Sequence, residues 1–118
     1  MLPPLYRIRK KEEFEKIFHS KKTARVTSEF FTLYVTQSRE THSRFGFVVS
    51  TKVSKKATAR NKLKRRMRAV AARAFPAVKT GVDVVLVARP QAEKATFQEI
   101  AKTITNLLQT SRLISTNR

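Results

Sequence analysis

The chain has 118 residues, 41% of them hydrophobic, which suffices for one folded domain and excludes a disordered or low-complexity chain. Its 26 Lys and Arg outnumber its 8 Asp and Glu, and the resulting net charge of +18 favours a polyanionic partner such as nucleic acid. The chain contains no cysteine, which excludes disulfides, thiolate nucleophiles and cysteine-based zinc sites.

The sequence predicts one domain over residues 1–118, with a polar, frayed tail at 111–118. The N-terminal residues MLPPLYRIRKK are charged where a signal peptide would be apolar. The longest apolar run, at 82–88, is interrupted by Asp83 and is too short to span a bilayer. We therefore expect a cytoplasmic protein that does not associate with membranes.

The first half of the chain predicts one helix and two strands. Phe14, Ile17 and Phe18 have helical spacing, which predicts a helix over 10–19 without a good N-cap. Residues 28–36 alternate with period two, which predicts a strand with aromatic side chains on both faces. One face carries Phe31, Leu33 and Val35, and the other carries Phe30, Thr32 and Tyr34. A polar segment follows, and its length predicts an antiparallel hairpin with a second strand at 44–50.

The second half predicts helix, strand and helix. An apolar stripe predicts a basic helix over 57–75, which Pro76 and Gly81 end. The stripe consists of Leu63, Met67, Val70, Ala71 and Ala74. The nearly continuous apolar run 82–88 predicts an interior strand, so residues 44–88 form a βαβ unit. Thr96 and Glu99 have capping-box spacing. The helix after them carries an apolar stripe of Phe97, Ile100, Ala101, Ile104, Leu107 and Leu108.

The basic helix concentrates the charge. Residues 41–82 contain twelve Lys or Arg and no acid, and six of these cations lie within 59–68. A solvated basic face is disfavoured because like charges at helical spacing repel without acids to pair with. A membrane-surface helix would need bulkier apolar residues opposite the cations. One exposed side carries Arg60, Asn61, Lys64, Arg65 and Arg68, and another carries Lys62, Arg66 and Arg73. Phosphate binding fits this helix best.

Aromatic residues could supply a stacking surface for nucleic-acid bases. Tyr34, with Phe30 on the same strand face and Phe14 and Phe18 from the first helix, could form such a platform. Ordinary core packing explains the three phenylalanines equally well. Asn61 can donate to and accept from a base edge or ribose.

The sequence predicts neither catalytic nor metal-ligating residues. His19 and His42 are isolated, and Asp83 is the sole aspartate. Metal-dependent phosphodiester hydrolysis needs clustered carboxylates to hold the ions, and we find none along the sequence.

Residues 54–68, SKKATARNKLKRRMR, resemble the signature of the bacterial ribonuclease P protein component at every fixed position. The resemblance extends to the aromatic residues of the first helix and strand, the run FVVSTK, and Arg89-Pro90 after the apolar strand. Two positions differ. Lys55-Lys56-Ala57 stands where many members have Gly-Asn-Ala, and Lys62 replaces an arginine, keeping the charge without the planar fork.

The resemblance implies an α+β two-layer sandwich of order αβββαβα, like domain 2 of ribosomal protein S5. It implies a four-stranded sheet, a short extra strand near residues 25–27, and a left-handed βαβ crossover against the usual right-handed rule.

The resemblance also implies a function, as the protein subunit of an enzyme that removes the 5′ leader of precursor tRNA. The RNA subunit would hold Mg²⁺ and cut, with no metal bound tightly by the protein and no obligate protein partner. The implied contacts with the RNA subunit are Lys52, Lys55, Lys56, Arg60, Asn61, Lys62, Lys64, Arg65 and Arg68. The implied leader-binding cleft contains Phe14, Phe18, Phe30, Tyr34, Arg60, Asn61 and Arg89. The alternatives are a small basic ribosomal or other structural RNA-binding protein, and a self-sufficient nuclease.

Overall fold

The computed structural model describes residues 6–38 and 41–114, and its helices and strands follow the predicted order αβββαβα. The helices are α1 (Lys11–His19), α2 (Ala57–Ala74) and α3 (Phe97–Thr110). The strands are β1 (Ala24–Thr27), β2 (Phe31–Gln37), β3 (Arg44–Val48) and β4 (Val82–Ala88). The 3-10 segments η2 (Phe75–Ala77) and η3 (Pro90–Lys94) flank β4. Within the described ranges, no helix is long and apolar enough to cross a membrane.

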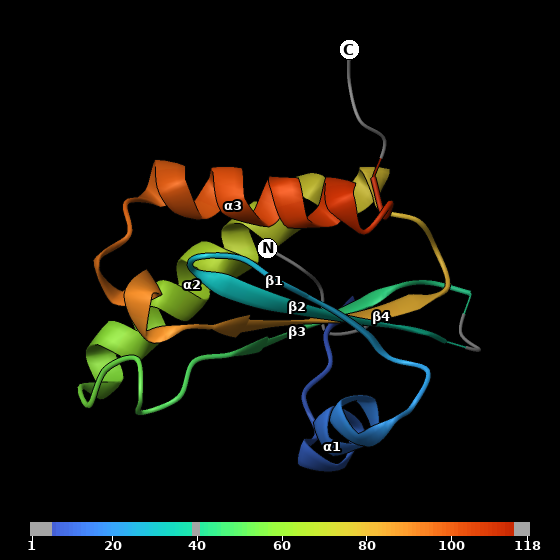
Figure 1. Cartoon of the computed structure of the whole chain (residues 1–118), viewed down its shortest axis with the longest axis horizontal. Helices are drawn as coiled ribbons and strands as arrows, with labels where there is room; N and C mark the ends of the chain where they lie inside the picture. Colours follow the sequence, from blue (N-terminus) through green and yellow to red (C-terminus); the bar gives the residue numbers. More distant parts are fainter. Residues whose placement is uncertain (1–5, 39–40, 115–118) are drawn as a thin grey trace.

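The helices cover the sheet unequally. α2 and α3 form a layer on one face, and α1 lies against the other face (Figure 1). The larger core cluster includes residues of α2, α3 and their face of the sheet, among them Phe31, Met67 and Leu86. A smaller cluster on the α1 face is built around Ile8, Ile17 and Val85. The predicted α+β sandwich is therefore confirmed, with α1 as an addition on the far side.

The strand order corrects one prediction. The sheet runs β1-β2-β4-β3, so β4 separates the two strands that the sequence predicted as a hairpin. β4 is antiparallel to β2 and parallel to β3. Its apolar side chains are buried on both faces, and a strand of this kind is most stable at the centre of a sheet. The predicted interior position of β4 and the βαβ unit are confirmed. The left-handedness of the crossover stays a prediction.

Ser43 fixes the start of β3 beside β4. Its hydroxyl donates to the carbonyl oxygen of Lys79 at 2.6 Å and accepts from the amide of Val82 at 3.1 Å. The side chain is 2% exposed, so both of these hydrogen bonds are shielded from water. These bonds hold the start of β3 against β4, on the side of β4 away from β2.

The register shows which side chains share the α1 face. Arg44 is paired with Asp83, and Gly46 with Val85. Tyr34 lies on the other side of Val85, and Arg25 of β1 lies beyond Tyr34. Because directly paired residues point to the same face, one row across the sheet carries Arg25, Tyr34, Val85 and Gly46.

The ends of α3 differ from the prediction in two places. Thr96 and Glu99 form the predicted capping box, with both reciprocal hydrogen bonds present. Phe97 was predicted on the buried stripe but is 38% exposed, because it occupies the first position of the helix. Residues 111–114 are not frayed, since Leu113 is buried and its carbonyl oxygen accepts from the Lys79 amide at 2.7 Å. The rest of the predicted tail, 115–118, lies outside the described residues.

Candidate nucleic-acid interface

α2 packs on the sheet along one narrow stripe and leaves its cations on the remaining sides. Leu63, Met67, Val70 and Ala71 of the predicted stripe are buried, and Ala74 is half-buried. In residues 6–38 and 41–114, Arg44 is the only cation that forms an ion pair. The cations of α2 therefore repel one another without internal compensation, as expected of a surface that binds a polyanion.

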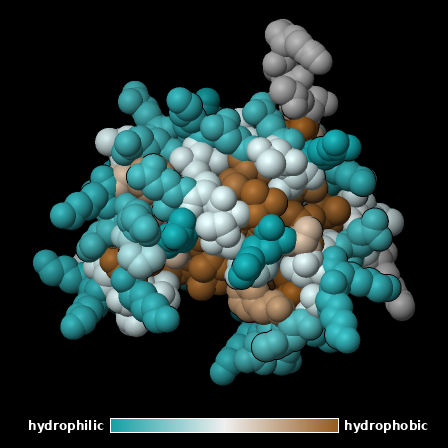
Figure 2. Space-filling model, viewed as in Figure 1, coloured by the Kyte–Doolittle hydropathy of each residue, from teal (hydrophilic) through white to brown (hydrophobic). Residues whose placement is uncertain are grey.

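A groove of about 530 Å³ lies between the first turns of α2, the preceding loop and η3. Its charged lining consists of Lys55, Lys56, Lys62, Arg66 and a single acid, Glu93. The N-cap residue of α2, Lys56, gives no side-chain cap, and the first turn has no acid. The free N–H groups there add the positive end of the helix dipole to the cations around the groove. This end of the molecule is suited to phosphate groups, and Figure 2 shows hydrophilic side chains crowded over it.

The nine residues predicted to contact the RNA subunit lie on one continuous segment, 52–68, but they differ in exposure. Those that are exposed are Lys52, Lys55, Lys56, Asn61, Lys62 and Arg65. Arg60, Lys64 and Arg68 are half-buried along one flank of the helix. Arg60 donates through Nη1 to the Ser54 carbonyl oxygen at 2.9 Å, so it also holds the loop in front of α2. The Nε of Arg68 is enclosed and has no partner among the described residues.

Three of the predicted aromatic residues meet on the α1 face of the sheet, and we call Phe14, Phe18 and Tyr34 the aromatic platform. The rings of Phe18 and Tyr34 are 4.9 Å apart between centroids in an edge-to-face arrangement, and those of Phe14 and Phe18 are 6.4 Å apart. Phe14 and Tyr34 are half-buried, whereas Phe18 is 38% exposed. Phe14 thus belongs partly to the small core, and Phe18 offers a ring to solvent on which a base could stack.

The structure separates Phe30 from this platform. The amide of Ser28 donates to the Phe31 carbonyl oxygen at 2.9 Å, so residues 28–31 turn between β1 and β2, and Phe30 precedes the strand. The alternation of β2 does not extend to it, and Phe30 packs against the large core on the α2 and α3 side. The prediction that Phe30 shares a face with Tyr34 was therefore wrong.

The remaining residues of the predicted cleft lie near the ends of the strands. Arg89 directly follows β4, and its Nη1 donates to the Ser28 carbonyl oxygen. Arg60 and Asn61 lie in the first turns of α2, which project beyond the ends of β3 and β4, whereas α1 lies on the opposite face (Figure 1). The sheet thus has the platform on one face and the first turns of α2 at one end.

Two cations near these surfaces, Arg25 and Arg66, were not among the predicted contact residues. Arg25 of β1 is exposed and lies directly beside Tyr34 in the sheet register. The resemblance placed Arg25 in a short extra strand, but the alternation over residues 24–27 is too short to show which face of the sheet its side chain occupies. Arg66 lines the groove together with Lys62, on the side of α2 where the sequence already placed both, and only the packing of η3 beside α2 shows that this side forms a groove.

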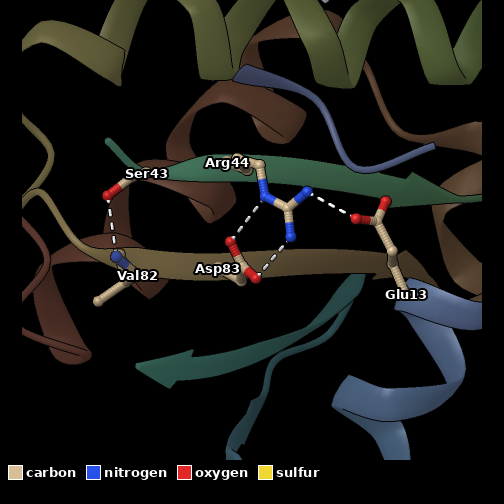
Figure 3. A network of polar contacts seen from close by, with 5 residues as sticks. All are labelled: Glu13, Ser43, Arg44, Val82 and Asp83. Carbon is tan, nitrogen blue, oxygen red and sulfur yellow. Dashed lines mark hydrogen bonds and ion pairs between the residues drawn. The ribbon is translucent and has the colours of Figure 1, made fainter. Parts of the chain in front are cut away.

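A charged network attaches α1 to the sheet. Arg44 donates through Nε and Nη2 to the two carboxylate oxygens of Asp83, at 3.1 and 3.0 Å, and through Nη1 to Glu13 at 2.7 Å (Figure 3). The hydrogen bond from Arg44 is the main cause that lowers the pKa of Glu13 below its ordinary value of 4.5, against partial burial. Hydrogen bonding to Asp83, and then to Glu13, raises the pKa of Arg44 above its ordinary value. Both shifts favour the charged forms, so Glu13 and Arg44 form an ion pair at neutral pH.

A strongly basic α+β domain with a cationic helix, a groove lined by cations and a partly exposed aromatic platform has the features of a small RNA-binding protein. The family model described as Ribonuclease P matches residues 2–112. The ribonuclease P protein component of Pseudanabaena sp. is 33% identical over 118 residues, covering 99% of this chain and 100% of that protein. That of Synechocystis sp. is 34% identical over 113 residues, covering 96% and 90%. The solved RNase P protein of Staphylococcus aureus superposes with a TM-score of 0.84 at 28% identity, covering 93% of this chain and 98% of that chain. The chain belongs to the ribonuclease P protein family and is a protein component of a ribonuclease P holoenzyme.

Proposed function

We propose that this chain binds the RNA subunit of ribonuclease P through residues 52–68 and binds the 5′ leader of precursor tRNA on the aromatic platform. In this way it assists the endonucleolytic cut that produces the mature tRNA 5′ end. We place the reaction in the cytoplasm and invoke no further protein partner. The observation that carries the proposal is the exposed ring of Phe18 in α1, which packs edge-to-face against Tyr34 of β2, while α2 on the other face of the sheet carries cations without ion pairs among the described residues.

The two surfaces match the two parts of such a substrate. Phosphates of a folded RNA need cations, and the exposed side chains of α2 and the groove beside it supply them. An unpaired leader exposes base faces, and aromatic rings bind those faces without regard to sequence. Arg25 beside Tyr34 supplies a cation for the backbone of a strand that crosses the platform.

We further propose that the magnesium ions needed for cleavage are held mainly by the RNA subunit. The carboxylates of this chain have other roles where the structure shows them. Glu13 and Asp83 bind Arg44, and Glu99 caps α3. In the described ranges, no three His, Asp or Glu side chains come together in a way that could hold a metal ion.

A matched pair of variants tests the platform. Phe18 and Phe97 are both 38% exposed, one on the platform and the other at the start of α3. Phe18→Ala removes a stacking surface worth about 1 to 3 kcal/mol per base, so the holoenzyme should bind leader-bearing precursor more weakly and mature tRNA unchanged. Phe97→Ala should alter neither affinity. Equal weakening of both ligands by Phe18→Ala would show that the ring does not contact the leader.

A further inference from the structure

Arg44 links α1 to the sheet, and among the described residues it makes the only polar contact between α1 and strands β3 and β4. It is the first residue of β3, and on the α1 face its guanidinium lies between Asp83 of β4 and Glu13 of α1 (Figure 3). Two of its nitrogens bind Asp83 as a fork, which fixes the plane of the guanidinium. The third nitrogen then points at Glu13 in a defined direction. α1 is thus attached to a fixed point where the first residues of β3 pair with β4.

The other attachments of α1 are few. Its N-cap residue, Lys10, provides no side-chain cap, and Ile17 is its only buried residue. The ring of Phe14 occupies the space that a side chain at position 46 would need, since a Cβ on Gly46 would lie 2.5 Å from Phe14 Cε1. Adjacent residues of α1, Glu13 and Phe14, therefore contact alternate residues of β3, Arg44 and Gly46. These contacts set the rotation and height of α1 over the sheet.

The position of α1 sets the geometry of the platform. Phe18 follows Phe14 by one turn of the helix, so a shift of the Glu13 end moves the Phe18 ring relative to Tyr34, which belongs to the sheet. The present centroid distance of 4.9 Å leaves these rings in contact. Without the ion pair, α1 would be held mainly by Ile17, the ring of Phe14 and the hydrogen bond from Thr23 Oγ1 to the Ile17 carbonyl oxygen at 2.7 Å.

We propose that Arg44 and Glu13 are positioning residues for leader recognition: they fix α1, and with it the aromatic platform, in the arrangement that prefers a precursor with a leader over mature tRNA. The inference rests on the proposed function of the platform. It assigns a positioning task to a charged network that lies outside the predicted RNA-contact residues. A lysine at position 44 would keep the charge but could not bind both carboxylates in this geometry.

If Glu13 acted only through its charge, Glu13→Ala would strengthen RNA binding, whereas a positioning role predicts a weaker preference for the precursor. Removing an acid from a protein that binds a polyanion lowers repulsion and should strengthen binding of every RNA ligand equally. Glu12 supplies the matched control, because it is exposed in the same turn of α1 and makes no ion pair within the described residues. Glu12→Ala and Glu13→Ala change the net charge and the helix propensity identically.

The experiment measures the affinity of the reconstituted holoenzyme for precursor tRNA and for mature tRNA, and takes the ratio of the two dissociation constants. Glu13→Ala and Arg44→Lys should each reduce the preference for the precursor by about threefold to tenfold. Glu12→Ala should leave the ratio unchanged. In a Phe18→Ala background, Glu13→Ala should cause no further loss, because it acts through the same platform. An unchanged ratio in Glu13→Ala and Arg44→Lys would overturn the inference. So would a double variant, Phe18→Ala with Glu13→Ala, whose loss of precursor preference equals the sum of the two single losses.

A measurement without RNA separates this inference from the proposed function. In the free chain, the nuclear Overhauser contact between the rings of Phe18 and Tyr34 should weaken in Glu13→Ala and persist in Glu12→Ala. If the contact persists in both variants, the network does not position the platform, whatever the RNA data show. If the contact weakens only in Glu13→Ala but Phe18→Ala leaves the precursor preference intact, the proposed leader site is wrong, and the role assigned to Arg44 in leader recognition falls with it.

Discussion

Asn61 and Arg65 lie on the outermost side of α2, opposite the stripe that packs on the sheet. Their side chains are exposed and make no hydrogen bond or ion pair with the described part of the chain, whereas Arg60 on the neighbouring flank bonds to the Ser54 carbonyl oxygen. Replacing Arg65 therefore tests RNA binding without disturbing the fold. Arg68 is a poorer probe, since it is half-buried and its Nε is enclosed.

For Arg65→Ala we expect weaker binding of the RNA subunit and a salt dependence whose slope falls by roughly 0.7 to 0.9 if one phosphate contact is lost. Thermal stability should hold or rise slightly, because a repulsive charge disappears. Lys102→Ala on α3 is the control, since it removes one exposed cation outside residues 52–68. A slope that falls as much in Lys102→Ala would mean that overall charge, and not the α2 surface, controls binding.

At the scale of elements, the close approach of α1 to the sheet depends on Gly46, which has no side chain. The ring of Phe14 lies over Gly46, and a Cβ there would also approach Phe14 Cζ to 2.9 Å and Ile8 Cβ to 3.2 Å. Protein cores tolerate such crowding poorly, because the neighbouring side chains are close-packed. α1 is thus fitted to β3 by shape at Gly46 and by charge at Arg44.

Gly46→Ala should lower the free energy of unfolding by about 1 to 3 kcal/mol, because the Phe14 ring must leave its position. In a Phe14→Ala background the same change should cost much less, since the space is then free. Denaturant unfolding of both single variants and the double variant measures this coupling. Strictly additive losses would contradict the contact between the ring and Gly46.

On the scale of the whole molecule, charge is distributed over a body of 38 × 36 × 26 Å with a net charge of +18. The described ion pairs neutralise only Arg44, which lies between sheet and helix. Among the other described cations, those that are exposed, such as Lys62 and Arg65, are available to phosphates. If the chain binds both RNAs as proposed, its cations screen the repulsion between them, which magnesium would otherwise have to neutralise.

We therefore expect the chain to lower the magnesium concentration at which its RNA subunit cleaves precursor tRNA. A cleavage assay over a magnesium series, with RNA alone, protein alone and both together, measures this shift. The protein alone should be inert at every concentration. If the protein alone cleaves, and a variant with Glu12, Glu13 and Asp83 changed to amides does not, the protein and not the RNA subunit carries out the cleavage, and our assignment is wrong.

The sequence by itself determined the elements whose signals are local. The stripe from Leu63 to Ala71 predicted α2, the apolar run of β4 predicted an interior strand, and the capping box placed the start of α3. The signature at 54–68 predicted the family. Each of these depends on residues within a few turns of one another, where periodicity and composition act directly.

Only the tertiary structure decided which elements are neighbours. β4 lies between β2 and β3, which no spacing along the chain required, because strand pairing joins residues far apart in sequence. Arg44 bonds to Glu13 and Asp83, which are 31 and 39 residues away along the chain. Phe30 does not share a face with Tyr34, because a turn precedes β2. Side-chain alternation fixes a face only within one strand, so the platform and its network arise from packing between elements.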